Sequence, residues 1–112
     1  MKKPKYPEAF IGDPWDMLAE EATEIVHARF KAIRWGLQGG YGYVKRDGNP
    51  SPREQIIQEL GDLLFIVDVL TIRGEITRDE LPAAKDKKWQ RLCELFGASH
   101  VDDWAKKRGR YA

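Results

Sequence analysis

The sequence has little of what several protein classes depend on. It contains one cysteine, Cys93, so no disulfide can form within the chain, and no cysteine spacing indicates a zinc site. Its longest apolar run, residues 63–67, is far shorter than a transmembrane helix. Its net charge is only +1, which gives no overall attraction to nucleic acid or to an anionic membrane. We therefore expect a cytoplasmic protein that binds neither nucleic acid nor membranes.

The composition is that of one folded domain spanning residues 1–112. Hydrophobic residues make up 42% of the chain and charged residues 33%, and 112 residues suffice for a single core. Residues 1–13 contain helix-breaking prolines and no periodic pattern, so they are predicted to form an N-terminal arm. Residues 36–50 are rich in glycine and are predicted to form a long loop, with a short hairpin near residues 41–44. Residues 106–112 form a basic tail.

Helix-start and helix-stop signals divide the rest of the chain into helices. Asp13 and Pro14 begin the first helix, which is predicted to end near Trp35. One face of this helix is predicted to carry Leu18, Ala22, Ile25, Val26, Arg29 and Ile33. Ser51 to Glu54 is a capping box that begins the second helix, which is predicted to end near residue 72 or 73, before Gly74.

Two further helices follow. Thr77 to Glu80 repeats the capping-box pattern and begins a third helix, which Gly97 ends. Ser99 is predicted to cap a short fourth helix over residues 101–107. The predicted fold class is all-α, an antiparallel helical bundle of three long helices plus a short C-terminal helix.

The predicted second helix is apolar on almost every side. A helix of this kind is normally the central helix of a bundle. Two long helices and one short helix of this size do not cover it fully, so we expect a second copy of the chain to complete the core. The predicted assembly is a homodimer or a dimer of dimers.

Two carboxylates interrupt this apolar helix. Glu59 and Asp62 lie one turn apart, and burying such a pair is costly unless a cation compensates. The first helix carries Glu20, Glu21 and Glu24, of which the last two have the same spacing. Two antiparallel helices with such pairs can bring four carboxylates to one point, which suits Mg²⁺ or Mn²⁺. The alternatives are a solvated acidic face on the first helix and an ion pair between Glu59 or Asp62 and a lysine of the third.

Basic residues on the first and third helices suit an anionic substrate. Lys31 and Arg34 lie further along the polar face of the first helix, and Lys85 and Lys88 lie on the third. A metal ion placed between a phosphate chain and a water molecule is a common arrangement for phosphoanhydride hydrolysis. The residues therefore favour chemistry on a phosphorylated substrate.

The acidic motifs resemble those of a known family. Glu20-Glu21-Ala22-Thr23-Glu24, followed downstream by Glu59-Leu60-Gly61-Asp62, is similar to the EExxE…ExxD signature of the MazG-like all-α NTP pyrophosphatases. Lys85-Asp86-Lys87-Lys88-Trp89 stands where that family has a Lys-Asn-x-x-Arg/Lys-aromatic run. The resemblance covers about residues 15–96. The chain departs from the family pattern in a longer gap between the acid pairs and in Asp86, where asparagine is common.

The resemblance implies an activity and roles for individual residues. The activity is Mg²⁺-dependent cleavage of a (d)NTP into a (d)NMP and pyrophosphate; Mn²⁺, which suits the same carboxylates, is the alternative metal. The implied metal ligands are Glu21, Glu24, Glu59 and Asp62, while one of these glutamates or Glu20 orients the attacking water. Lys85 and Lys88 are implied to contact the phosphates.

Other substrates and functions stay open at this point. The glycine-rich loop is hypothesised to lie near the mouth of the site, where Trp35, Tyr41 or Tyr43 would select the substrate. A related substrate such as dUTP or phosphoribosyl-ATP is one alternative. A non-catalytic helical dimer that binds another protein is the alternative from a different class.

Overall fold

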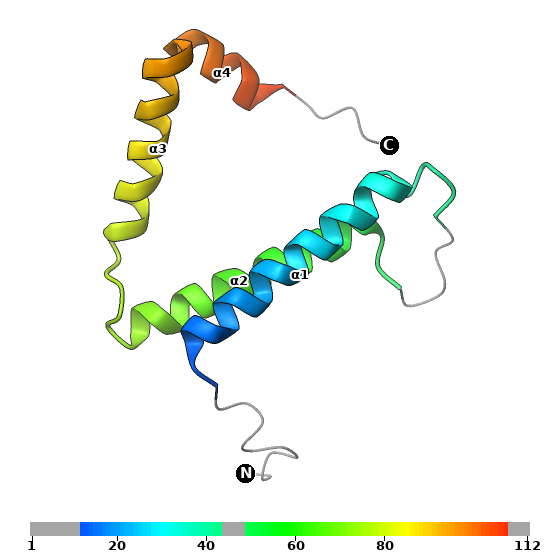
Figure 1. The fold of residues 1–112 in the computed structure, drawn as a ribbon, viewed down its shortest axis with the longest axis horizontal. Helices are drawn as coiled ribbons and strands as arrows, with labels where there is room; N and C mark the ends of the chain where they lie inside the picture. Colours follow the sequence, from blue (N-terminus) through cyan, green and yellow to red (C-terminus); the bar gives the residue numbers. More distant parts are fainter. Residues whose placement is uncertain (1–11, 44–48, 108–112) are drawn as a thin grey trace.

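The structure, a computed structural model, describes residues 12–43 and 49–107. Within these ranges the chain forms α1 (Pro14–Trp35), α2 (Pro52–Ile72), α3 (Glu80–Phe96) and α4 (Ala98–Lys106), without any strand (Figure 1). The all-α prediction is confirmed. No helix in these ranges is both long enough and apolar enough to cross a membrane. Most of the predicted arm and tail lies outside the described residues.

The two long N-terminal helices begin where the sequence predicts. The Asp13 carboxylate accepts a hydrogen bond of 2.8 Å from the backbone N–H of Trp15, and Pro14 is the first helical residue. The Ser51 hydroxyl accepts one of 3.2 Å from the backbone N–H of Glu54. Both side chains therefore satisfy donors that the first turn of a helix leaves without a partner.

The third and fourth helices begin differently from the prediction. The backbone N–H of Thr77 donates to Glu80 Oε1 at 3.2 Å, which is one half of the predicted capping box. Helix α4 begins at Ala98 rather than residue 101, because the backbone N–H of Val101 donates to the Gly97 carbonyl at 3.1 Å and so closes a helical turn directly after α3. Gly97 permits this corner with a φ of 86°.

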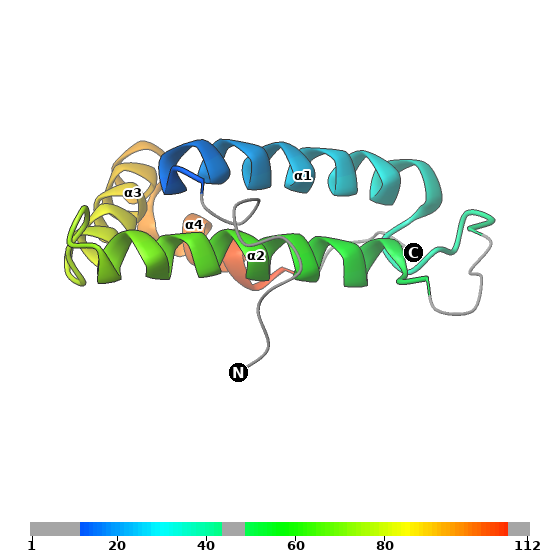
Figure 2. The ribbon, with the colours of Figure 1, turned by 90° about the horizontal axis from the view of Figure 1, so that it is seen from below.

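Helices α1 and α2 pack side by side and antiparallel (Figures 1 and 2). Their contact buries Ala28 and Ala32 of α1 and Ile66 and Leu70 of α2, each at most 4% exposed. Small alanines one turn apart allow the two backbones to approach closely. The buried stripe of α1 is therefore rotated from the predicted face, and Val26, assigned to that face, is 50% exposed.

Helices α3 and α4 form a second unit, named here the α3–α4 arm. They contact each other, and among the four helices neither contacts α1 or α2 (Figure 1). The radius of gyration is 18.2 Å, whereas a compact chain of this length has about 13 Å. Within one chain, the antiparallel arrangement thus applies to α1 and α2 alone.

The described parts of the glycine-rich loop are held at their base. The Tyr43 hydroxyl donates to the Pro50 carbonyl at 2.9 Å, and its ring lies 6.3 Å from that of Trp35. The backbone N–H of Arg53 donates to the Leu37 carbonyl at 2.9 Å, which ties the two ends of the loop together. Residues 36–43 and 49–50 contain turns and no strand, and the predicted hairpin extends into residues outside the described ranges.

Candidate metal centre

Three carboxylates converge where α1 packs on α2. One oxygen from each of Glu21, Glu59 and Asp62 lies within 4.8 Å of the others, and we call this group the acidic cluster. Helical spacing explains the convergence. Glu21 precedes the buried Ala28 by seven residues, and Glu59 precedes the buried Ile66 by seven, so each glutamate lies two turns from a core residue on the contact stripe of its helix. The antiparallel packing brings these positions together.

The electrostatics of the cluster are unfavourable without a cation. Glu21 and Glu59 are half-buried, and Asp62 is exposed. Partial burial, followed by the negative charges of Asp62, Glu59, Glu24 and Glu20, raises the pKa of Glu21 above its usual 4.5. No side chain in the described ranges forms an ion pair or hydrogen bond with the three clustered carboxylates.

The chemistry of the donors fits a hard divalent cation. Three carboxylate groups offer only oxygen, which Mg²⁺ and Mn²⁺ prefer, and within the described residues the cluster has no sulfur or nitrogen donor of the kind common in zinc sites. Mg²⁺ bound through few protein ligands keeps coordination positions for water and phosphate oxygens. An exposed Asp62 beside two half-buried glutamates leaves one side of the cluster open to such ligands.

The other two acidic residues predicted for the site lie close by. Glu24, the predicted fourth ligand, is exposed and does not belong to the group within 4.8 Å. Glu20, one of the residues predicted to orient the attacking water, is also exposed. Both nevertheless act on the pKa of Glu21, so their charges lie near the cluster.

The predicted substrate-binding residues of α1 lie further along the helix. Lys31 and Arg34 are exposed on α1, and Lys31 follows Glu21 by ten residues, or about 15 Å along the axis. Trp35 is half-buried against Tyr43 at the C-terminal end of α1, about 21 Å along the axis from Glu21. The described base of the glycine-rich loop lies at that same end of the helix pair, so within one chain it does not border the acidic cluster.

The predicted phosphate-binding lysines lie on the separate arm. Lys85 and Lys88 are exposed on α3, which contacts neither α1 nor α2. Lys85 lines a shallow hollow at the α2–α3 corner together with Asp68. A single chain therefore assembles the carboxylates without the lysines.

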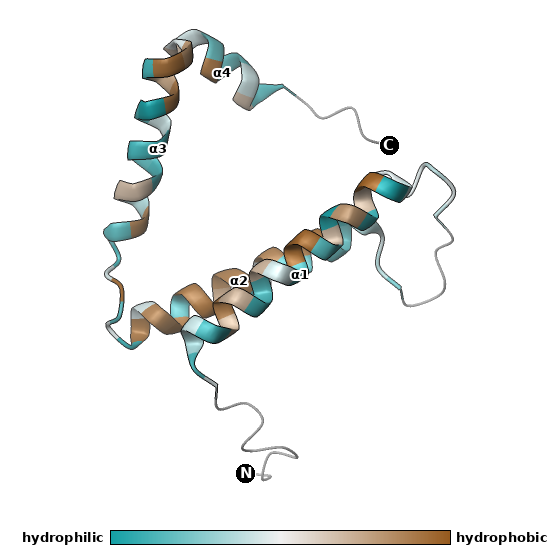
Figure 3. Cartoon of the chain, in the orientation of Figure 1, coloured by the Kyte–Doolittle hydropathy of each residue, from teal (hydrophilic) through white to brown (hydrophobic). Residues whose placement is uncertain are grey.

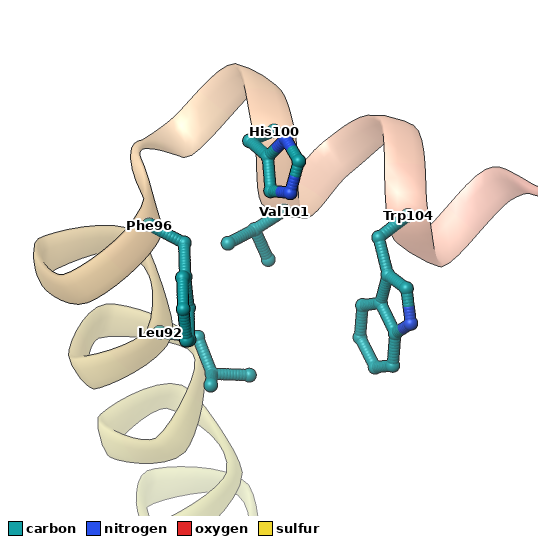
Figure 4. A pocket seen from close by; sticks show the side chains of 5 residues that line it. All are labelled: Leu92, Phe96, His100, Val101 and Trp104. Carbon is teal, nitrogen blue, oxygen red and sulfur yellow. The ribbon is translucent and has the colours of Figure 1, made fainter.

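The arm also contains an apolar pocket that the motifs did not single out. A cavity of about 280 Å³ lies in the corner between α3 and α4 (Figure 4). Its lining comes from Leu92, Phe96, His100, Val101 and Trp104. Leu92 and Phe96 are four residues apart on α3, and Val101 and Trp104 are three apart on α4, which is the signal in the sequence that could have predicted an apolar surface on each helix.

Comparison with known proteins identifies no relative of this chain. No family model, no curated protein sequence and no solved structure matches this chain. The convergence of the three carboxylates, the donor chemistry and the motif spacing are therefore the grounds on which a function is argued.

Proposed function

We propose that this chain is a Mg²⁺-dependent nucleoside triphosphate pyrophosphohydrolase that cleaves a (d)NTP into a (d)NMP and pyrophosphate. The observation that carries the proposal is the acidic cluster, in which oxygens from two helices approach within 4.8 Å. Its residues come from the two motifs that resemble the MazG-like signature. Mn²⁺ fits the same oxygen donors and is proposed as an alternative to Mg²⁺.

The residues have separate roles in this proposal. Glu21, Glu59 and Asp62 hold the cation, and Glu24, one turn from Glu21, completes the ligand set. When bound, Mg²⁺ supplies Lewis-acid polarisation of the phosphates and eases deprotonation of a water. Glu20 accepts a hydrogen bond from the attacking water and so orients it towards the scissile phosphorus.

Cationic side chains complete the proposed site. Lys85 and Lys88 neutralise the departing pyrophosphate, since their ammonium groups are mobile point charges suited to phosphate. Lys31 and Arg34, on the exposed side of α1, guide the anionic substrate towards the acidic cluster. Trp35 lies about 21 Å along α1 from Glu21, which is too far to contact the base of a nucleotide bound at the acidic cluster of the same chain.

We also propose that the enzyme is a homodimer, which can pair further into a dimer of dimers. Val26 and Ile33 of α1 and Leu60 and Leu64 of α2 are 42–62% exposed, and we call them the apolar hairpin face. At 100° per residue, the two residues of α1 lie about 100–140° around the helix axis from Glu21, and the two residues of α2 lie at the same angle from Glu59. In an antiparallel pair this equal rotation places both sets on the same side. Figure 3 shows hydrophobic positions, in brown, along both α1 and α2. An apolar surface shared by two helices is a typical subunit interface.

Pyrophosphate release tests the proposed activity. The purified protein is assayed against dNTPs, NTPs, dUTP and phosphoribosyl-ATP with Mg²⁺ or Mn²⁺, alongside Glu59→Gln. Glu94→Gln is a matched control, because Glu94 is exposed on α3 and outside the acidic cluster. We expect metal-dependent release that Glu59→Gln abolishes and Glu94→Gln preserves. Release confined to dUTP or phosphoribosyl-ATP would identify the related substrate, while no release from any nucleotide would favour a non-catalytic helical dimer.

A further inference from the structure

Helix α3 exposes an apolar stripe that contains a lysine. Leu81, Lys88, Leu92 and Leu95 are spaced by seven, four and three residues, which places them on one face of the helix. Leu81 is 44% and Leu95 is 74% exposed, and no residue of α3 is buried. The stripe leads from Lys88 into the apolar pocket of the α3–α4 arm, which Leu92 and Phe96 line (Figure 4).

Helix α2 exposes a stripe of the same form with the opposite charge. Asp62, Phe65, Val69 and Ile72 are spaced by three, four and three residues, so they also share one face. Phe65 is 51% and Ile72 is 83% exposed. In α2 the apolar residues follow Asp62 towards the C-terminus, and in α3 Leu81 precedes Lys88 while Leu92 and Leu95 follow it. Parallel packing of the two helices would therefore pair Asp62 with Lys88 and Phe65 with the pocket.

The structure does not pair these stripes within one chain, because α3 contacts neither α1 nor α2. An α3 that folded back across the short connection after α2 would run antiparallel to it. The connection also directs α3 away from α2 (Figure 1). The backbone N–H groups of Glu75 and Ile76 both donate to the Leu70 carbonyl, at 3.0 and 3.4 Å, and so hold this corner.

We propose that the α3–α4 arm of one chain packs in parallel on α2 of a second copy. In this arrangement Lys88 of one copy lies against Asp62 of the other, and the arm's apolar pocket accepts Phe65. The acidic cluster of each copy thereby gains a cation that its own chain does not bring to it, placed where it can neutralise the phosphates of a bound substrate. The inference rests on the homodimer of the proposed function but not on its chemistry.

Cross-linking between isotopically distinct copies tests the contact. The full-length protein is prepared with ¹⁴N and with ¹⁵N, the two preparations are mixed until subunits exchange, and a carbodiimide joins amines to adjacent carboxylates. Mass spectrometry then shows whether a Lys88–Asp62 link joins the same or different isotopes. We expect about half of these links to be mixed, as random pairing of two labels in a symmetric dimer requires. Lys87 is the internal control, because it lines a different face of α3 with Gln90 and Glu94 and should give no such link.

Each other outcome overturns the inference. A monomer at micromolar concentration in sedimentation equilibrium would do so, as would the absence of the link. Links that join only equal isotopes would show that the arm packs on its own chain. Interchain links in a protein that hydrolyses no nucleotide would refute the proposed activity and leave the packing intact, so the two failures are distinguishable.

A charge reversal supplies a second measurement. Lys88→Glu places like charges together twice in each dimer and is expected to raise the dimer dissociation constant by at least about tenfold. Lys87→Glu makes the same change on the other face and should leave it within about twofold. Both lysines are exposed, so neither change disturbs a core, and circular dichroism verifies the helix content. Equal dissociation constants for the two variants would contradict the contact.

Discussion

Leu64→Ser tests most directly whether the apolar hairpin face is the dimer interface. Leu64 is 62% exposed on α2, so its contribution to the stability of the single chain is small. Complete burial of a leucine side chain is worth about 1.5–3 kcal/mol, so covering the exposed part is worth about 0.9–1.9 kcal/mol. A symmetric dimer covers two copies, which gives about 2–4 kcal/mol. Because 1.4 kcal/mol corresponds to tenfold, the dissociation constant is expected to rise about 20- to 500-fold.

Sedimentation equilibrium over a range of protein concentrations measures this change. Gln58→Ser is the matched control, since Gln58 is also exposed on α2 but does not belong to the apolar hairpin face. The control should dimerise as the unaltered protein does. A dissociation constant for Leu64→Ser equal to that of the control would refute the assignment of this face, provided that both variants keep their helix content.

Three further predictions concern the acidic cluster and the core. Glu59→Gln should abolish the rise in melting temperature that Mg²⁺ produces in the unaltered protein; an unchanged rise would exclude Glu59 as a ligand. Because the pKa of Glu21 is raised above 4.5, this carboxylate becomes protonated at a higher pH than an ordinary glutamate, and Mg²⁺ binding should begin to weaken at that higher pH. Mg²⁺ titrations at several pH values measure this. An affinity that stays constant down to pH 4.5 would contradict it. Leu70→Ala should lower the free energy of unfolding by about 2–5 kcal/mol in urea, because Leu70 is only 2% exposed, whereas Leu95→Ala, at 74% exposed, should have a much smaller effect; equal losses would refute this core assignment.

Local signals predicted most of the helix boundaries because they act within a few residues. The Asp13 and Ser51 caps are visible in the sequence, and the structure shows both hydrogen bonds. The start of α4 was predicted three residues late, because Ser99 was expected to cap it. The turn is instead closed by a backbone hydrogen bond to the Gly97 carbonyl. A bond between backbone groups does not depend on a particular side chain, so the sequence does not indicate it.

The packing of α1 was predicted less well, for a physical reason. Periodicity identifies an apolar face but does not determine what covers it. Val26 and Ile33 were assigned with Ile25 to one face of the first helix, yet α2 packs on the small residues Ala28 and Ala32 and leaves Val26 and Ile33 exposed. Larger side chains on α1 thus remain for another surface, which is the basis for the proposed dimer.

The candidate site was also predicted only in part. The spacing of Glu59 and Asp62 in an apolar helix and the acidic run on α1 were enough to predict that carboxylates meet, because spacing fixes which residues share a helix face. Only the antiparallel packing decided that Glu21, rather than Glu24, lies within 4.8 Å of Glu59 and Asp62. The separation of Lys88 from these carboxylates within one chain likewise follows from the direction in which α3 leaves α2. The sequence alone thus determined the helices and the acidic motifs, whereas the distances that define a binding site depend on how helices distant in the chain pack together.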